Sequence, residues 1–179
     1  EIDAAHQARL SEYPDPALSK KAKSSFAQTS AERLAIVAKY QPALKNGVAD
    51  RGRAIFQKNC TPCHKFQGMG NEVGPNIAAR QDKSNEGLLR EILDPNRAVD
   101  SHYVAYVAVT TDGLVKTGIL SEETGNSITL LGQNGEKTVL LRSQLESLTS
   151  SGKSLMPEGL EKQITPEEMA DLIKFLATP

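Results

Sequence analysis

Apolar residues recur at helical spacing in four stretches of the 179-residue chain. A capping-box pattern at Thr29 and Glu32 precedes the first stretch and predicts a short helix that ends at the Gln41-Pro42 step. Asp50 can accept the free amides of a second helix, which runs from Arg51 to about Cys60. Each of these helices is expected to bury one face.

Two more helices are expected in the second half of the chain. Ser84 can cap a helix with an apolar face at Leu88 and Leu89, and the Asp94-Pro95 step should end it. The sequence Thr165-Pro166-Glu167-Glu168 combines a capping box with proline at the first helical position. It predicts a C-terminal helix whose apolar positions are Met169, Leu172, Ile173 and Leu176.

Between these two helices the apolar pattern changes to that of β-strands. The run Tyr103–Val109 is rich in residues that favour strands, and Asp112-Gly113, Gly125-Asn126 and Asn134-Gly135 are hairpin-turn signals. We therefore predict a four-stranded antiparallel meander or small barrel over residues 102–148. The expected fold class is mostly α with a β insertion (α+β). Proline residues and high polarity over residues 3–26 leave room for short helices only.

Composition restricts the possible partners. A formal net charge of −1 and a pI near 6.4 argue against a nucleic-acid partner. The longest apolar run, Val104–Val109, is much shorter than the roughly 20 residues of a membrane span.

No signal-peptide pattern opens the sequence, so we expect Glu1 to follow a processed leader or to continue a larger chain. Aromatic residues make up only 4%, and a large apolar cofactor could fill the core.

The two cysteines of the chain occur in the sequence Cys60-Thr61-Pro62-Cys63-His64. In a Cys-x-x-Cys-His motif both thiols form thioethers with the vinyl groups of a haem, and the histidine ligates the iron. Two intervening residues separate the sulfurs by about the distance between neighbouring vinyl groups. The motif predicts one covalent haem c on Cys60 and Cys63, with His64 as an iron ligand.

Other interpretations of the motif fit the sequence less well. A thioredoxin-like dithiol would follow a strand, whereas here a helix is expected before Cys60. A structural zinc site takes four Cys or His ligands, and an iron–sulfur cluster takes mostly four cysteines. The chain has two Cys and three His, and His6 and His102 offer no second pair of ligands. The dithiol remains an alternative hypothesis.

A methionine sulfur is the sixth ligand expected of a high-potential haem, and three methionines are candidates. Met156 lies in a proline-containing loop before the last helix, where its sulfur could be aimed at the iron. Met69 follows His64 too closely to reach the opposite haem face, and Met169 lies on an apolar helix stripe. His102 is the fallback ligand. A carbonyl in the Gly74-Pro75 segment could accept the Nδ1 proton of His64, although an ordinary turn is the alternative.

Several of these motifs together resemble class I c-type cytochromes. They are Gly52-x-x-x-Phe56 before the attachment motif, Gly74-Pro75 after it, a methionine loop, and Ala170–Leu176 at the end. The resemblance implies three helices around the haem. It also implies that Gly52 lets the first and last helices cross closely, against Phe56 and Leu172, and that Pro75 holds the proximal histidine through its carbonyl.

Three further segments resemble the haem-binding domain of the planctomycete and verrucomicrobium type: Leu89–Val99, Asp112–Gly118 and Ser154–Leu160. This resemblance covers about residues 30–178. It implies a cytochrome c domain over residues 46–179, with residues 100–150 as an inserted β subdomain. The polar residues near the start of the chain predict a helical arm or linker over residues 1–45. Domains of this type commonly end large secreted dehydrogenase-like proteins, which implies a periplasmic or otherwise extracytoplasmic location.

The first functional hypothesis is electron transfer without conversion of a substrate, between redox partner proteins. A fused or separate dehydrogenase is the expected donor, and the acceptor is unknown. The second hypothesis is an enzyme site or gas sensor with five-coordinate iron. Four basic residues flank the motif and could attract an acidic partner, or form an ordinary solvated face: Arg51, Arg53, Lys58 and Lys65.

Overall fold

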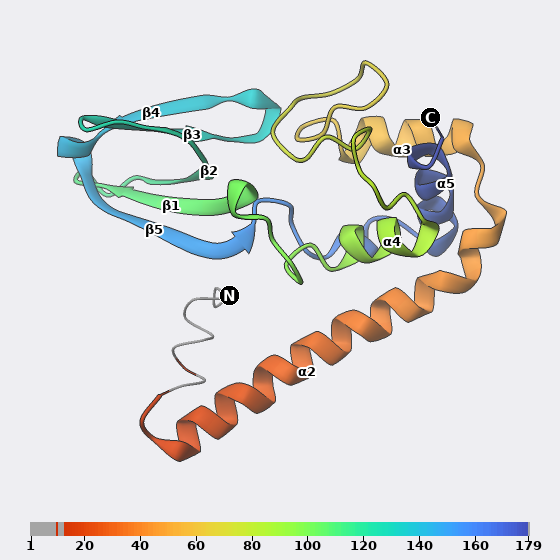
Figure 1. Ribbon diagram of the computed structural model, residues 1–179, viewed down its shortest axis with the longest axis horizontal. Coiled ribbons are helices and arrows are strands. Elements are labelled where there is room, and N and C mark those ends of the chain that lie inside the picture. Colours follow the sequence, from red (N-terminus) through yellow and green to blue (C-terminus); the bar gives the residue numbers. More distant parts are fainter. Residues whose placement is uncertain (1–9, 11–12, 179) are drawn as a thin grey trace.

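The computed structural model describes residues 10 and 13–178, with the side chains of residues 23–30 left out. A helical half and an antiparallel sheet lie side by side, and one long helix extends away from both (Figure 1). His6 lies outside the described residues. No described helix combines the length and the apolar character needed to cross a membrane.

The long helix α2 spans Pro16–Tyr40 without interruption. Asp15 accepts hydrogen bonds from the amides of Ala17 and Leu18, and Pro16 occupies the first turn. The prediction of short helices only over residues 3–26 was therefore wrong, and so was the helix start at Thr29. Proline lacks an amide hydrogen that the first helical turn does not use, so it begins this helix instead of interrupting it.

After α2, a short 3₁₀ helix, η1 (Gln41–Asn46), leads into α3 (Ala49–Asn59). The helix α3 begins at Ala49, and the amide of Gly52 donates to the carbonyl of Val48 over 3.1 Å. Asp50 therefore lies inside the first turn and is not the capping residue that the sequence predicted. The residue at the cap is Val48, whose side chain makes no capping bond.

The helix α3 crosses the C-terminal helix α5 (Pro166–Leu176) at very short distance. A Cβ atom at Gly52 would lie 2.0 Å from the carbonyl oxygen of Asp171, so no larger residue fits without a shift of the backbone. Phe56 and Leu172 are fully buried beside this crossing. The close approach expected from Gly52, and the packing of its two neighbours, are therefore confirmed.

The two remaining helix predictions hold closely. The helix α4 spans Asn85–Leu93, the hydroxyl of Ser84 accepts the amide of Gly87 over 3.1 Å, and Asp94 ends the helix. In α5, Thr165 and Glu168 form the expected capping box with Pro166 in the first turn. The helical core gathers around three aromatic rings in mutual contact, which belong to Phe56, Phe66 and Phe175.

The sheet contains five antiparallel strands in the order β4-β3-β2-β1-β5. The strands are β1 (Val104–Thr110), β2 (Val115–Glu123), β3 (Ser127–Leu131), β4 (Lys137–Leu141) and β5 (Leu145–Ser154). Short 3₁₀ turns accompany them at η2 (Ser101–Tyr103), η3 (Gln133–Gly135) and η4 (Arg142–Gln144). Another, η5 (Leu160–Lys162), lies before α5.

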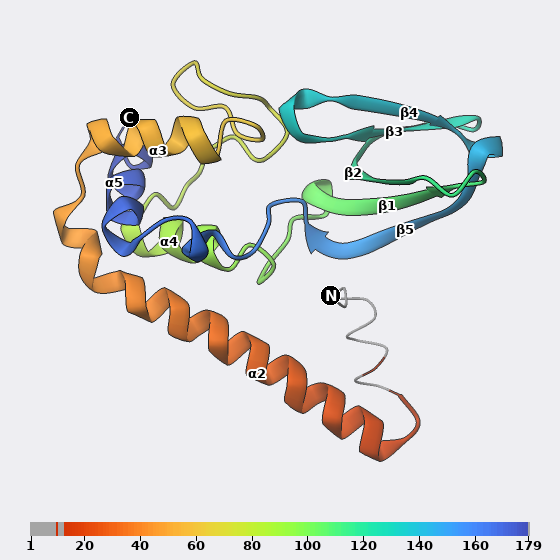
Figure 2. The same ribbon diagram turned by 180° about the vertical axis from the view of Figure 1, so that it is seen from behind.

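The sheet corrects two sequence-based expectations. It has five strands where four were predicted, because the serine-rich segment that forms β5 pairs with β1 although it lacks an apolar alternation. It is open and not a closed barrel, since β4 and β5 are edge strands that do not pair with each other in the described part of the chain. Its own small core consists of Ala108, Ile128, Leu130 and Leu140. Figure 2 shows the sheet beside the helical half from behind.

Candidate functional site

The attachment motif forms a single turn at the end of α3. The amide of His64 donates to the carbonyl of Cys60 over 2.8 Å, and that of Cys63 donates to the same carbonyl over 3.1 Å. This turn places both thiols and the imidazole on adjacent positions of one short segment. Both thiols are free and half-buried.

The loop after the motif folds back on it. The amides of Val73 and Gly74 donate to the carbonyl of Cys63 over 3.0 and 2.7 Å, and the amide of Asn71 donates to the carbonyl of Thr61 over 3.0 Å. These bonds bring the Gly74-Pro75 step, expected to lie in a loop, against the ring of His64.

The Pro75 carbonyl oxygen lies 3.2 Å from Nδ1 of His64. A carbonyl can only accept a hydrogen bond, so Nδ1 carries the proton and Nε2 keeps a free lone pair. Gly74 leaves the space for this arrangement, because a Cβ atom there would lie only 2.4 Å from Cε1 of His64. The imidazole is therefore held in the tautomer that suits a metal ligand.

Burial shifts the proton equilibria of all three side chains of the motif. It lowers the pKa of the His64 imidazole, a shift that the Pro75 carbonyl opposes and the positive charge of Arg80 reinforces. It raises the pKa of the Cys60 thiol to about 12, with a smaller contribution from Cys63. Burial also raises the pKa of the Cys63 thiol. The imidazole is consequently neutral around pH 7, and both free thiols are protonated.

A cavity of about 610 Å³ lies between the helical half and the sheet. Leu88 and Ile92 of α4 line it together with Ile119 of β2 and Tyr103 of η2. All six residues singled out as cofactor-binding from the sequence also line it: Cys60, Cys63, His64, Gly74, Pro75 and Met156. The structure therefore brings these candidate residues together around one space.

The three methionines lie in different surroundings. Met156 follows β5 in a loop that lines the cavity, and its amide donates to the hydroxyl of Ser154 over 3.1 Å. Met169 is fully buried in the helical core. Met69 packs against the edge of that core, and its sulfur accepts a hydrogen bond from the amide of Gln57. Both arrangements agree with packing roles.

His102 lies apart from this space. Its side chain is 85% exposed, its Nδ1 lies 2.9 Å from a carboxylate oxygen of Asp100, and it is not among the residues that line the cavity. Among the described residues, no group of three or more His, Cys, Asp or Glu side chains is arranged to hold a metal ion.

Some residues at this site could not be recognised from the sequence. The turn η3 at the tip of the β3–β4 hairpin brings Gln133 to the cavity, and the amide of Asn134 donates to the carbonyl of Pro62 over 2.7 Å. Asn134-Gly135 was recognised as a turn, but nothing in the sequence indicated that this turn contacts the motif. Ile119 likewise had the pattern of an ordinary strand residue.

The residues present fit a haem. Two thiols, an imidazole with a free Nε2 and a methionine line the same partly apolar space. Arg80 also lines it and pairs with Glu91, while its Nε atom is buried without a hydrogen-bond partner in this structure. Haem propionates are anionic acceptors, so this unpartnered donor suits them chemically. A thioether is a soft ligand that suits iron in haem.

Comparison with known proteins agrees with this chemistry. Residues 47–101 match the family described as cytochrome C oxidase, cbb3-type, subunit III. A stretch of 52 residues is 44% identical to a cytochrome c-553-like protein of Synechocystis sp., and it covers 28% of this chain and 48% of that protein. This part of the chain is similar to a c-type cytochrome domain. It spans about half the length of the curated relative that it matches.

The cofactor of a c-type cytochrome domain is covalently bound haem c, and its function is electron transfer. The family match includes α3, the attachment motif, the following loop and α4. It ends at residue 101, before the sheet begins. Met156 and α5 therefore lie outside the matched part of the cytochrome domain.

Proposed function

We propose that this protein is a monohaem electron carrier in which His64 and Met156 would hold the haem iron. The haem supplies one-electron Fe(III)/Fe(II) chemistry when it is bound. The observation that carries the proposal is the lining of one cavity by the attachment motif and Met156. Iron held by both residues would have no open position for a substrate, so the site would move electrons and convert nothing chemically.

Each residue has a distinct role in this proposal. Cys60 and Cys63 form the two thioether bonds, and Gly74 leaves room for the imidazole that Pro75 orients. The thioether of Met156 is a softer and weaker electron donor than an imidazole, so a haem with this ligand would favour the reduced state more than one with two imidazoles. The partly apolar cavity wall acts in the same direction because it disfavours the extra charge of the ferric form.

The first experiment measures covalent haem directly. Protein matured in a host with c-type cytochrome assembly should carry the mass of one haem and give a pyridine haemochromogen spectrum of the two-thioether type. The Cys60→Ala/Cys63→Ala variant is the control and should lack both signals. A matured protein without haem, with a reversible Cys60–Cys63 disulfide, would establish the dithiol alternative instead.

The second experiment identifies the sixth ligand. Met156→Ala should abolish the charge-transfer band that methionine sulfur gives to ferric haem, and the reduced variant should bind carbon monoxide readily at neutral pH. Met69→Ala is the matched control and should leave both properties unchanged, since Met69 packs against the helical core and does not line the cavity. Ready carbon monoxide binding by the unmodified protein would favour the five-coordinate gas-sensor or enzyme hypothesis.

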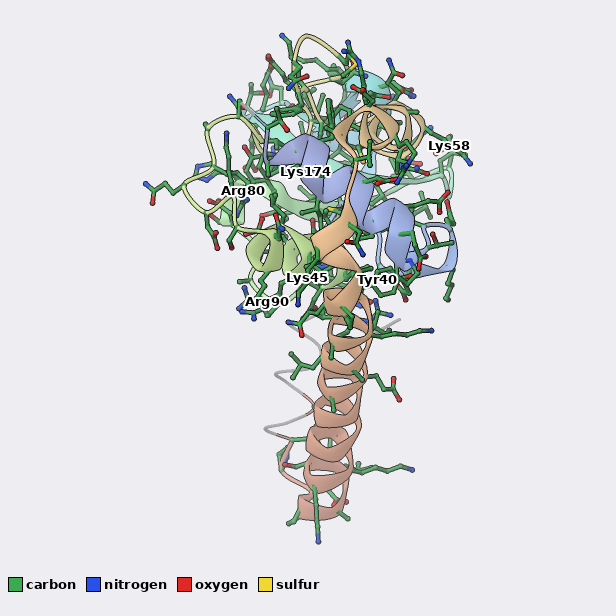
Figure 3. All side chains as sticks on the ribbon, turned by 90° about the vertical axis from the view of Figure 1, so that its right-hand side faces the viewer. Tyr40, Lys45, Lys58, Arg80, Arg90 and Lys174 are labelled. Atoms are coloured by element: carbon green, nitrogen blue, oxygen red, sulfur yellow. The ribbon has the colours of Figure 1, made fainter. Side chains whose placement is uncertain are left out.

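The donor is a dehydrogenase, fused to this chain or separate, and the domain acts outside the cytoplasm. These proposals rest on the resemblance to the planctomycete and verrucomicrobium type and on the known site of thioether formation in bacteria. Figure 3 shows basic side chains from several elements on the side of the helical half: Lys45, Lys58, Arg80, Arg90 and Lys174. Of the basic residues near the motif, Arg51 pairs with Asp171 and Lys65 with Glu72, so part of this charge is neutralised locally.

A further inference from the structure

The side chain of Asn96 connects both ends of the loop that carries Met156. Its Oδ1 accepts the amide of Ser154 over 2.9 Å, and its Nδ2 donates to Oε1 of Glu158 over 2.9 Å. Asn96 comes from the segment after α4, far from the loop in sequence, and all three side chains are half-buried. One amide group therefore spans the five-residue segment 154–158 with Met156 at its middle.

The contact continues from Ser154 to the methionine itself. The amide of Ser154 donates to Asn96, and the hydroxyl of Ser154 accepts a hydrogen bond from the amide of Met156 over 3.1 Å. These two bonds form an unbroken series from Asn96 through Ser154 to the backbone of Met156. The position of the methionine thus depends on a side chain that belongs to a different part of the fold.

The chemistry of the partners determines how the Asn96 amide is oriented. The Ser154 amide can only donate, and the Glu158 carboxylate can only accept, so oxygen must face the first and nitrogen the second. Aspartate, leucine or alanine at position 96 could not satisfy both partners. The arrangement is therefore specific to a carboxamide of this length.

We propose that Asn96 is the positioning residue for Met156, and that it sets how firmly the methionine sulfur stays on the haem iron. This inference rests on the proposed function, because it requires Met156 to be a ligand. A thioether is a weak, neutral ligand, so the free energy that keeps it in place comes largely from the loop that presents it. Residues that hold a metal ligand in position typically change metal–ligand affinity by 10- to 100-fold when removed.

Competition by added imidazole tests this inference. Imidazole binds ferric iron only where the methionine sulfur has left, so its apparent affinity reports how firmly Met156 is held. Asn96→Ala should raise the imidazole affinity about tenfold and weaken the methionine charge-transfer band. Asn85→Ala is the matched control: it removes an exposed asparagine from the start of α4, and it should leave the affinity unchanged.

The same substitution in a Met156→Ala background separates positioning from general loosening of the fold. If Asn96 acts through Met156, Asn96→Ala adds nothing to the imidazole affinity of Met156→Ala. Equal increases in both backgrounds would overturn the inference, as would an unchanged affinity of Asn96→Ala alone. If Met156→Ala itself has the spectrum and imidazole affinity of the parent protein, the ligand assignment fails and the inference fails with it. These outcomes are distinguishable in one series of titrations.

A second test exchanges the carboxamide of Asn96 and the carboxylate of Glu158, so that no side-chain volume is removed. Asn96→Asp retains the acceptor for Ser154 but opposes a carboxylate to Glu158, so imidazole affinity should rise. Adding Glu158→Gln restores a donor on the opposite side, and the double variant should return toward the parent affinity. Failure of this rescue, with both variants folded by circular dichroism, would contradict the role of the bridge.

Discussion

At the scale of single residues, the environment of His64 depends on two glycines that have no side chain as well as on the Pro75 carbonyl. The ring is bounded by the Gly74 backbone, and the Pro75 carbonyl oxygen accepts a hydrogen bond from Nδ1 over 3.2 Å. The neighbouring Gly70 has φ +85°, and a Cβ atom there would lie 2.1 Å from the His64 carbonyl oxygen. Two glycines thus allow the loop to enclose the histidine tightly.

Gly74→Ala should therefore displace the imidazole. The added methyl group would overlap the ring at 2.4 Å from Cε1, and the contacting atoms belong to a ring that Pro75 already holds. We expect a haem content reduced by about half or more and an altered Soret band in the haem that remains. Haem stoichiometry and the absorption spectrum measure this. Gly125→Ala, where no atom lies within 4 Å, is the control, and equal haem content in both variants would contradict the prediction.

At the scale of elements, local signals were sufficient for some segments and insufficient for others. The caps at Ser84 and Thr165 are contacts within four residues, so the sequence predicted α4 and α5 correctly. Strand β5 depends on pairing with β1, whose paired residues lie 35 or more positions earlier, and its own pattern of LESLTSSGKS contains no such information. In the same way, the Cys-x-x-Cys-His motif was sufficient to predict the attachment site at Cys60–His64. The tertiary contacts of Asn96 and Asn134 had no sequence signal.

The crossing of α3 and α5 yields a pH-dependent prediction. The carboxylate of Asp171 is buried, and it accepts the guanidinium of Arg51 over 2.6 Å and the amide of Val48 over 2.6 Å. The bond to Arg51 is the largest cause that lowers the pKa of Asp171 below its ordinary value, and the amide bond adds to it. The resulting stabilisation is present above the unfolded-state pKa and is lost as the pH falls through the lowered pKa.

Asp171→Asn should consequently lower the free energy of unfolding at pH 7 by about 1–2 kcal/mol. We discount the ion pair itself, since the Arg51 side chain is 63% exposed. The difference from the parent protein should shrink as the pH falls below about 4, where the unfolded-state carboxyl is protonated. Urea unfolding at several pH values measures this. A difference that stays constant with pH would exclude the carboxylate as its cause; Asp50→Asn is the exposed control.

The tip of the β3–β4 hairpin yields a prediction about backbone conformation. Asn134 has φ 59° and ψ 14°, a left-handed conformation that β-branched residues strongly disfavour, and its amide binds the Pro62 carbonyl. Asn134→Val should cost about 1–2 kcal/mol of unfolding free energy and increase amide exchange at the tip. Asn134→Gly retains the conformation and should have the parent stability within about 0.5 kcal/mol. Equal effects of the two substitutions would refute this explanation.

At the scale of the whole molecule, the cavity of about 610 Å³ joins two halves that otherwise have separate cores. Native interiors are closely packed, and this space next to Leu88 and Ile119 has room for a large group that would complete the core. The sparse aromatic composition had suggested such a filling group, but not that the sheet would form one of its walls.

Protein without haem should therefore be markedly less stable. We expect Cys60→Ala/Cys63→Ala to lose at least about 3 kcal/mol of unfolding free energy, because the apolar cavity walls lose their packing partner. For a chain of this length that corresponds to a decrease in Tm of about 10 °C. Differential scanning calorimetry measures it, with unmodified chain expressed without haem maturation as the control. If the unmodified chain without haem were as stable as the mature protein, the cavity would not need the cofactor.

Among the described side chains, the tertiary contacts of the long helix α2 lie near its C-terminal end, and Figure 3 shows Tyr40 where the helix meets the rest of the molecule. There Arg33 pairs with Glu161 over 2.8 Å, and the Tyr40 hydroxyl donates to the carbonyl of Ile164 over 2.8 Å. Both partners follow Met156 closely along the chain, whereas His64 is held by its immediate sequence neighbours. A mechanical load on the outer end of α2 would thus reach the segment after Met156 through these side-chain contacts, and α3 with the attachment motif through the backbone.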